Sequence, residues 1–586
     1  MRHQPKLLNQ RILWICSLCI ASGVISAFTA HALIQLIGLI TNISFYGRLS
    51  TAFVSPAENH LGFWMIPIPI AGGIIVGGMA RWGSKAIRGH GIPEAMEQVL
   101  RNESRIPARI TWLKPLSSAI AIGTGGPFGA EGPIIATGGA LGSLLGQLIH
   151  ITADERKVLL AAGAAAGMAA IFAAPVSAVL LAIELLLFER RARSLAPVAL
   201  ATVTATSIRY QLEGDGAIFA MSNIAIPGIG AVIAYTILGG LIGLISIWIS
   251  KSIYEIEDAF EKLPIHWMWW PALGGLAVGI IGYLNPHTLG VGYENIASIL
   301  NGKLAMGTLI GLCLLKFISW AIALGSGTSG GTLAPLFTIG SALGAIYGIA
   351  IANWLPWLNL DPRIAALVGM AALFAGASRA LLASVVFAFE TTLQPHGLLP
   401  LLGGCTAAYL VSALMMRNTI MSEKLIRRGV RVPSEYSADH LERITAGEIC
   451  SHEVITLQHS QSIEEVQDWL AQRSPETQHQ GYPVLNEAKQ IIGVVTRKDL
   501  IKSAHHTSTS IGDLITRSPL TIPESYTARE VADQMLKHNV GRMIVTKDAN
   551  SNSMIGIITR SDLLSAHYKR INESSVITRH LLPKKY

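Results

Sequence analysis

Long apolar tracts separated by short polar connections make up most of the chain, and this pattern ends near residue 417. A helix needs about 20 mostly apolar residues to cross a bilayer, and many stretches of this sequence are long enough. The pattern predicts a polytopic α-helical membrane domain, followed by a polar tail from about Glu423 onward. The expected spans include Ile12–Ile40, Phe63–Ala80, Val158–Phe188, Ile226–Ile249, Trp267–Leu284, Leu304–Leu324 and Ile364–Phe389.

Composition supports this interpretation, because 51% of the 586 residues are hydrophobic and only 14% are charged. A soluble domain usually carries about 25% charged residues. The first apolar segment follows a basic start but exceeds the short core of a signal peptide, so we expect a retained helix. Cys16 and Cys19 form a CxxC inside that segment with no second pair, which favours two small core residues over a metal or redox site.

The net charge of +8 lies largely at the ends of the expected helices. Such clusters are typical of cytoplasmic loops under the positive-inside rule. No basic patch is interleaved with aromatic residues, so we expect no nucleic-acid partner. The clusters are Arg81–Arg88, Arg101–Lys114, Glu189–Arg193 and Arg417–Arg431.

A repeat marks the tail, where IIGVVTRKDLIKS (Ile491–Ser503) recurs as MIGIITRSDLLSA (Met554–Ala566). The repeat and the helices and strands expected around it resemble a tandem pair of CBS domains between Gly447 and about His567. The resemblance implies that the T-x-x-D residues hold the ribose of an adenine nucleotide, whereas the alternative is that each Asp only caps its helix. The candidate nucleotide ligands are Thr496, Asp499, Thr559 and Asp562.

The membrane part contains a second repeat. Ala121–Gly146 aligns without gaps onto Ala323–Gly348, with ten of twenty-six positions identical, and Gly163–Glu184 aligns onto Gly369–Glu390. Two related halves, each with a Gly-rich interruption before a helix, are typical of a transporter whose site lies between the repeats. We expect the halves to be inverted, although the alignment itself does not fix their orientation.

The paired interruptions have the chemistry of an anion site. Their glycines allow close approach of the backbone to a ligand, and Pro133 and Pro335 suit the first turn of a helix. A helix N-terminus offers unpaired N–H groups and about half a positive charge, so converging N-termini bind an anion without a fixed cation. The stretch GHGIPEAMEQVL, which begins at Gly89, is a third such candidate.

Glu131 lies within one of these interruptions, in GTGGPFGAEGP. An ionised acid inside a bilayer costs about 2.5–3.5 kcal/mol on insertion scales, so it usually faces a cavity and is functional. At a helix N-terminus its carboxylate can occupy the place of an anion, and protonation or displacement then frees that place. These properties predict an acid-sensitive gate.

GHGIP, GAEGP and GTLAP occur in this order ahead of the CBS pair, and together they resemble the CLC family of chloride channels and proton–chloride exchangers. The resemblance covers about Ile12 to His567. It implies a homodimer in the lipid bilayer, one chloride pathway per subunit, and Glu131 as the gating glutamate. Amides of Gly129–Gly132 would face an outer ion position, and those of Thr332 and Leu333 a central one. The implied anion-binding residues are His90, Gly91, Ile92, Gly129, Ala130, Gly132, Thr332, Leu333 and Met421.

Three positions near the implied ion site depart from the family pattern. His90 replaces the serine of GSGIP; it either donates a hydrogen bond to the anion or turns aside to a backbone partner. Leu333 replaces the aromatic of GIFAP. Met421 stands where a tyrosine normally supplies a hydroxyl, so the inner ion site is expected to be wider, weaker or differently lined.

The proton pathway of the exchangers also lacks its usual acid. FAAPVSAVLLAIELL gives Glu184 and then Leu185, which stands where the proton-handling carboxylate would be. We interpret Glu184 and its repeat partner Glu390 as structural acids at helix ends, and Glu189 as a member of an interfacial salt bridge. Because some exchangers lack the inner acid, its absence favours passive conduction and leaves proton-coupled antiport as the alternative.

Other classes fit less well. An intramembrane protease needs HExxH or a paired serine and histidine, but the His452–Glu453 pair is followed by Val-Ile-Thr and lies in the tail. We therefore expect no enzyme activity, no catalytic or metal site and no required cofactor. A cation transporter would need clustered intramembrane acids, and a fluoride-specific relative would depart more strongly at GHGIP.

The expected protein is a chloride channel gated by Glu131, with regulation by the CBS pair. Its all-α membrane domain covers residues 1–430, and a linker covers 431–446. Two α/β CBS domains follow at 447–508 and 509–570, with a tail at 571–586. We expect a plasma or inner membrane location, with the CBS domains in the cytoplasm.

Overall fold

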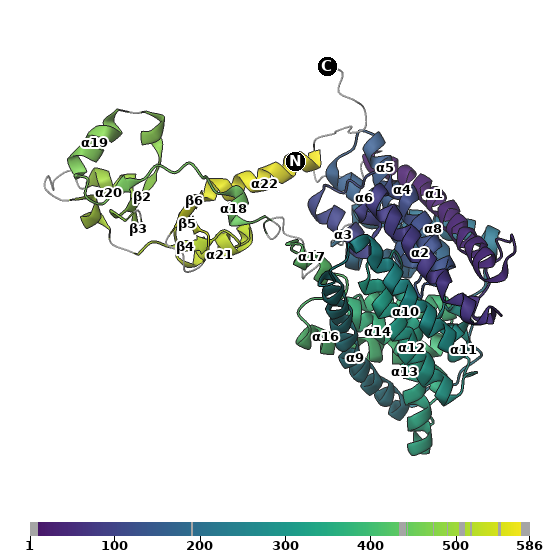
Figure 1. The fold of residues 1–586 in the computed structure, drawn as a ribbon. Coiled ribbons are helices and arrows are strands. Elements are labelled where there is room, and N and C mark those ends of the chain that lie inside the picture. Colours follow the sequence, from purple (N-terminus) through teal and green to yellow (C-terminus); the bar gives the residue numbers. More distant parts are fainter. Residues whose placement is uncertain are drawn as a thin grey trace. The chain divides into compact units, whose positions relative to one another are not determined.

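The computed structural model describes residues 10–188, 192–432, 441, 444–472, 474–488, 490–502, 510–515, 518–548 and 553–575. Glu189 and its expected salt bridge lie outside these ranges. The chain divides after Val432 into two compact units, one of helices and one of mixed helices and strands (Figure 1). The predicted fold class is confirmed.

The described part of the first unit contains two successive runs of eight α-helices and a short final helix, α17 (Glu423–Arg427). The first run consists of α1 (Gln10–Thr41), α2 (Pro67–Gly78), α3 (Ile92–Arg101), α4 (Ile110–Gly123), α5 (Glu131–Leu148), α6 (Ala153–Phe172), α7 (Pro175–Leu181) and α8 (Ala192–Glu213). The second run consists of α9 (Ile229–Glu261), α10 (Trp270–Leu284), α11 (Tyr293–Leu300), α12 (Met306–Gly325), α13 (Leu333–Trp354), α14 (Pro362–Ser378), α15 (Leu381–Thr392) and α16 (Leu398–Met415).

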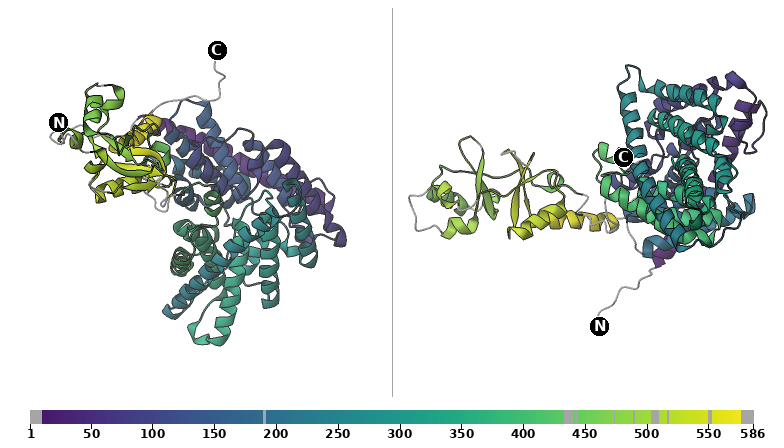
Figure 2. Two further views of the ribbon diagram at one scale, coloured as in Figure 1. Left: turned by 60° about the vertical axis from the view of Figure 1, so that its left-hand side comes forward. Right: turned by 90° about the horizontal axis from the view of Figure 1, so that it is seen from below.

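A local two-fold relation joins the two halves. Gly129 and Gly331 occupy equivalent positions in the repeat, and each donates its N–H to the carbonyl of the other, at 3.2 and 2.9 Å. Because the two strands of this bridge run antiparallel, the segments on either side of it run in opposite directions. The first half (purple to blue) and the second half (teal to green) lie side by side in Figures 1 and 2.

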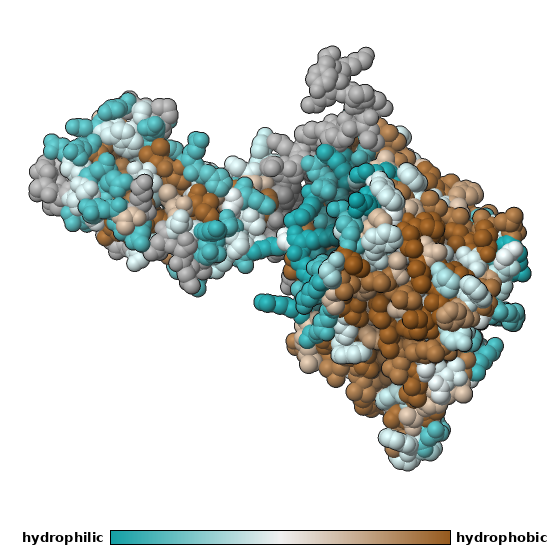
Figure 3. Space-filling model, in the orientation of Figure 1, coloured by the Kyte–Doolittle hydropathy of each residue, from teal (hydrophilic) through white to brown (hydrophobic). Residues whose placement is uncertain are grey.

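Seven helical segments of the described residues are long and apolar enough to cross a membrane. The face of this unit seen in Figure 3 is largely brown, whereas the second unit is mostly teal and white. Small residues let the helices inside approach closely: a Cβ on Gly138 of α5 would overlap the carbonyl of Gly163 on α6, and a Cβ on Gly163 that of Gly138. Such small-residue crossings are typical of membrane helices.

Two expected spans are wrong as continuous helices. Val158–Phe188 breaks at Ala173, which adopts a left-handed φ of 52°, and Ile364–Phe389 breaks at the equivalent Arg379, with a φ of 60°. Pro175 explains the first break, since it has no N–H and disfavours a helical residue before it. No proline follows the second break, where the next helix is fixed by a side chain from the other half.

The second unit contains two three-stranded sheets with the same topology, β1-β2-β3 and β4-β5-β6. In each sheet the first pair of strands is parallel and the second antiparallel. Its first elements are α18 (Ala446–Ile449), β1 (Leu457–Gln458), α19 (Ile463–Ala471), β2 (Gly481–Leu485), β3 (Ile491–Thr496) and α20 (Arg497–Lys502). They are followed by the 3₁₀ helix η13 (Ile511–Leu514), β4 (Thr521–Pro523), α21 (Ala528–Lys537), β5 (Arg542–Thr546), β6 (Met554–Thr559) and α22 (Arg560–Ser575).

The two lobes of this unit exchange their leading segments. Ala446 donates its N–H to Tyr526, and Ser451 pairs with Ile557, so the segment that opens the first repeat packs on the second sheet. In the same way, Ile511 donates to the carbonyl of Gln461 in the first lobe. Boundaries drawn along the sequence at 447 and 509 therefore do not separate the lobes in space.

Candidate functional site

Four helices of the first unit begin around one point. Two antiparallel hydrogen bonds join the loops before α5 and α13, and Gly89, in the loop before α3, bonds to Thr328 and Gly330. The first N–H groups of a helix have no partner inside it and carry partial positive charge, so this arrangement suits an anion. The first residues of the four helices are Ile92 (α3), Glu131 (α5), Tyr293 (α11) and Leu333 (α13).

Glycine is required in these loops because their backbones touch. A Cβ on Gly91 would overlap the carbonyl of Gly132, and a Cβ on Gly132 would overlap the carbonyl of His90. A Cβ on Gly331 would lie 2.5 Å from the carbonyl oxygen of Gly129. Replacing any of the three would push the helix starts apart.

Two fully buried lysines fix the loops in front of α3 and α11. Each ammonium group donates to two backbone carbonyls of the loop, and the two lysines occupy equivalent places on α4 and α12. The loop before α11 could have been found in the sequence, since GVG at 290–292 matches GHG at 89–91. However, no proline follows GVG as it follows GHG. The bonds run from Lys114 Nζ to Ile87 and Gly89 (both 2.8 Å), and from Lys316 Nζ to Thr288 (3.0 Å) and Gly290 (2.8 Å).

Glu131 lies at the centre of this arrangement and is fully buried. Its Oε1 accepts a hydrogen bond of 2.7 Å from the hydroxyl of Tyr293, whereas its Oε2 has no hydrogen-bond partner. The side chain folds back over Gly129, where any Cβ would overlap the carboxylate. The carboxylate also faces the backbone amide of Ala334, in the first turn of α13. It therefore occupies the place that the helix ends offer to an anion.

The structure qualifies the set of expected anion ligands. We expected the amide of Gly129 to face an ion, but it donates to the carbonyl of Gly331 instead. The amide of Gly91 is likewise occupied, because it donates to Glu94 Oε2 at 2.7 Å. The other expected ligands around these helix starts are all buried: Ile92, Ala130, Gly132, Thr332 and Leu333.

His90 is 4% exposed, and its Nδ1 has no hydrogen-bond partner. It lines a narrow cavity together with Tyr254, Glu257, Ile420 and Lys424. A buried imidazole nitrogen without a partner, beside a cavity, can donate to or accept from a ligand. Nδ1 therefore does not bond to the backbone, as the alternative would require. Thr332 Oγ1 is a second buried polar atom without a partner near the helix ends.

Met421 is fully buried among apolar side chains, and its neighbour Ile420 lines the cavity instead. A tyrosine does lie here, but it comes from α9. The hydroxyl of Tyr254 donates to the carbonyl of Ile420 at 2.7 Å. This tyrosine could not be predicted from the sequence, because it belongs to a different helix from the expected one.

Glu184 and Glu390 each cap the start of a helix in the other half of the unit. The carboxylate of Glu184 accepts the N–H groups of Leu382 and Ala383 at the start of α15, both at 3.1 Å. The carboxylate of Glu390 accepts those of the equivalent Val176 and Ser177 at the start of α7, at 3.0 and 2.8 Å. Both carboxylates thus cap a helix start in the other half, as we expect of structural acids.

Leu185 follows Glu184 in a single π-helical stretch, η6 (Ala182–Leu187), and is 5% exposed. It belongs to the main apolar cluster of the unit. The position therefore holds a packed hydrocarbon side chain.

Both T-x-x-D turns of the second unit are closed by their own side chains. Thr496 donates its N–H and its hydroxyl to Asp499 Oδ2, at 3.1 and 2.5 Å. Thr559 donates both groups to Asp562 Oδ2 at 2.7 Å. Each Asp thus caps the turn before α20 or α22, and a ribose hydroxyl would have to compete with the threonine for the carboxylate.

These features define an integral membrane protein built from two inverted halves, with a candidate anion site at paired helix N-termini. The chain belongs to the voltage-gated chloride channel (CLC) family: the family model described as "Voltage gated chloride channel" matches residues 72–413. The CBS domain model matches residues 446–506 and 511–569. The family resemblance seen in the sequence is confirmed.

Similar proteins include channels and exchangers by name. A "Putative chloride channel protein ClcB-like" of Ralstonia nicotianae is 29% identical over 364 residues, which cover 61% of this chain and 85% of the relative. An "H(+)/Cl(-) exchange transporter ClcA" of Vibrio campbellii is 27% identical over 424 residues, which cover 69% of this chain and 90% of the relative.

Two solved structures share the fold. A slow cyanobacterial Cl⁻/H⁺ antiporter superposes with a TM-score of 0.63 at 24% identity, covering 72% of this chain and 98% of that one. A eukaryotic CLC transporter superposes with a TM-score of 0.60 at 20% identity, covering 94% of this chain and 97% of that one.

Proposed function

We propose that this protein moves chloride across a membrane through one pathway in each subunit of a homodimer, with Glu131 as the gate. The observation that carries the proposal is the buried Glu131 carboxylate between the starts of α5 and α13, with one oxygen unpartnered. A carboxylate and a chloride ion compete for the same N–H donors. When Glu131 is protonated or displaced, chloride takes its place at the helix ends.

The mode of transport that we propose is passive conduction. Leu185 is packed in the apolar core, and Glu184 is engaged in capping α15, so neither is suited to carry a proton from the inner side. His90, with its unpartnered Nδ1, would contact the ion on the inner side of Glu131.

Proton-coupled exchange is the second candidate, and a specific observation favours it. Glu257 of α9 is half-buried and lines the same narrow cavity as His90 and Lys424. It could take up a proton from the inner side in place of the missing acid. The exchanger named among the relatives supports the same candidate.

The reversal potential of the purified protein in liposomes, under opposed chloride and proton gradients, tests the proposal. A reversal potential at the chloride equilibrium value supports a channel, and one that moves with the proton gradient supports exchange. Wild-type protein that passes no chloride under either gradient would contradict the proposal itself. Glu257→Gln is the matched variant, since it removes proton coupling only if Glu257 carries the proton.

For the second unit, we propose a regulatory role in the cytoplasm, with adenine nucleotide as the ligand. The support is the pair of equivalent T-x-x-D turns, Thr496–Asp499 and Thr559–Asp562. Transport itself would require no cofactor, enzymatic step or nucleic-acid partner, and the membrane would be the plasma or inner membrane. Saturable binding of ATP to the purified full chain, weakened by Asp562→Ala, is expected; no saturable binding would contradict the assignment of the ligand.

A further inference from the structure

Tyr293 is the first residue of α11 and the one side chain among the described residues that donates a hydrogen bond to Glu131. Its backbone is held firmly. Gly290 accepts from Lys316 Nζ and donates its own N–H to Gly125 at 3.0 Å, in the loop that leads toward Glu131. These bonds tie the loop before α11 to the loop that leads toward Glu131.

Aromatic rings pack against Tyr293, which is itself half-buried. The rings of Phe172 and Phe219 meet it edge to face, with centroids at 5.9 and 5.8 Å, and both side chains are fully buried. Phe53 stacks on it at 6.3 Å and is itself 41% exposed. Such a cluster fixes the tilt of the ring, so the hydroxyl keeps its direction.

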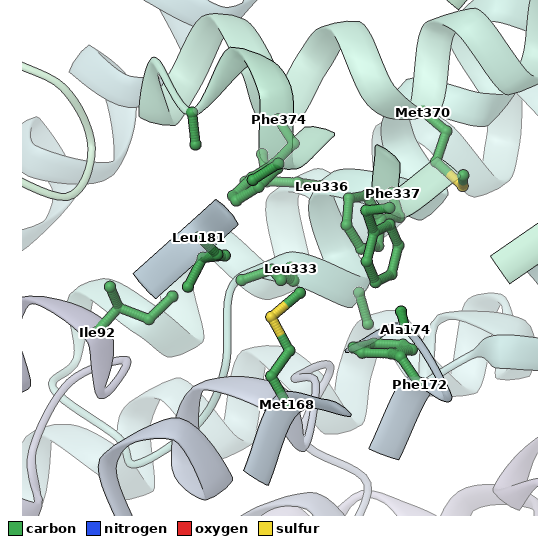
Figure 4. Close-up of a cluster of buried hydrophobic side chains, with 14 of the residues drawn as sticks. Ile92, Met168, Phe172, Ala174, Leu181, Leu333, Leu336, Phe337, Met370 and Phe374 are labelled. Carbon is green, nitrogen blue, oxygen red and sulfur yellow. The ribbon is translucent and has the colours of Figure 1, made fainter. Parts of the chain in front are cut away.

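The other half of the protein provides an internal comparison. Under the local two-fold relation, Glu131 corresponds to Leu333 and Tyr293 corresponds to Ile92, since these residues begin equivalent helices. Ile92 and Leu333 are both fully buried and lie in one cluster of apolar side chains (Figure 4). The fold therefore accepts a purely apolar pair at these two helix starts, and the polar pair is a property of one half only.

We infer that Tyr293 is a positioning residue for the gate, whose hydroxyl holds the Glu131 carboxylate over the ion position. The inference rests on the proposed function. Leaving the closed position requires this hydrogen bond to break, so Tyr293 favours the closed gate. Among the described residues, the Tyr293 hydroxyl is the hydrogen-bond donor to the carboxylate, and no cationic side chain forms an ion pair with it.

The test is Tyr293→Phe in the full-length protein, reconstituted in liposomes and assayed by chloride efflux at acidic and alkaline pH. Phenylalanine keeps the ring contacts and removes only the donor. We expect efflux at alkaline pH, where the gate is closed, to rise about tenfold, which corresponds to about 1.4 kcal/mol. Efflux at acidic pH should stay at the wild-type rate, so the ratio of the acidic to the alkaline rate falls by the same factor.

Two further variants separate this role from general loosening of the fold. Tyr347→Phe removes another hydroxyl of the membrane unit, which donates to the carbonyl of Ala234 at 3.0 Å, and should leave efflux unchanged. In a Glu131→Ala background, adding Tyr293→Phe should alter efflux by less than about twofold, because no acceptor remains there for the Tyr293 hydroxyl to hold.

The inference is overturned if Tyr293→Phe shows the wild-type rate or less at alkaline pH, if Tyr347→Phe raises efflux equally, or if the tenfold rise persists without Glu131. Failure of the proposed function has a different signature, since the wild-type protein would then show no chloride efflux to compare.

Discussion

The reciprocal capping of α7 and α15 predicts a stability cost that is separate from transport. Glu184→Ala removes a carboxylate that is 8% exposed and that accepts two amides of the other half, each at 3.1 Å. A hydrogen bond to a charged group contributes about 1.5–3 kcal/mol, so two bonds set an upper limit of about 6 kcal/mol. The lower end of this range for each of the two bonds gives about 3 kcal/mol. We expect Glu184→Ala to lower the free energy of unfolding by about 3 kcal/mol.

The assay is equilibrium unfolding of the detergent-solubilised full chain, followed by circular dichroism. Glu390→Ala is the matched variant, because it removes the equivalent cap, and it should cost a similar amount. Glu255→Ala on the exposed side of α9 is the control and should change the free energy of unfolding by less than about 0.5 kcal/mol. Glu184→Gln keeps an acceptor oxygen, so about half of the loss should remain.

The transport readout decides between a cap and a proton carrier. A cap predicts that Glu184→Gln leaves the reversal potential unchanged under opposed proton and chloride gradients. If Glu184→Ala unfolds like the Glu255→Ala control while its reversal potential loses dependence on the proton gradient, the capping argument is refuted.

Three further substitutions have defined outcomes. Gly129→Ala places a methyl group where the Glu131 carboxylate lies, so chloride efflux at alkaline pH should exceed the wild-type rate; an unchanged rate would contradict the observed position of the side chain. Lys114→Met removes the ammonium donor of the Ile87 and Gly89 carbonyls, leaving Gly89 only the long bond from Gly330, and should lower the free energy of unfolding by about 3 kcal/mol; a cost below 1 kcal/mol would argue against this support. Asp562→Ala removes the cap of α22 and should cost about 1 kcal/mol in thermal unfolding of the second unit, whereas no loss would rule out a capping role.

Local composition predicted the helix starts well. The repeat alignment placed Glu131 opposite Leu333, and both residues begin a helix in the structure. The glycines before them are needed because the loops touch backbone to backbone, and that requirement leaves a clear mark in the sequence. The third start, at Ile92, was marked by glycine and proline in the same way.

Features that depend on contacts between the halves could not be predicted. Nothing near Arg379 signals a helix break, because the cap of the next helix comes from Glu184 in the other half. Tyr293 begins a helix without a following proline, and its role depends on a bond to a residue in the first half. The exchange of leading segments between the lobes of the second unit is likewise a matter of packing that no local pattern encodes.

The central claim is that backbone N–H groups at the starts of α5 and α13 bind a halide beside Glu131. Anomalous diffraction from crystals of the Glu131→Gln variant soaked in bromide tests it directly. The claim predicts a bromide peak next to the amides of Thr332 and Leu333, on the side facing His90. A protein that transports chloride but shows no bromide at these helix starts would contradict it.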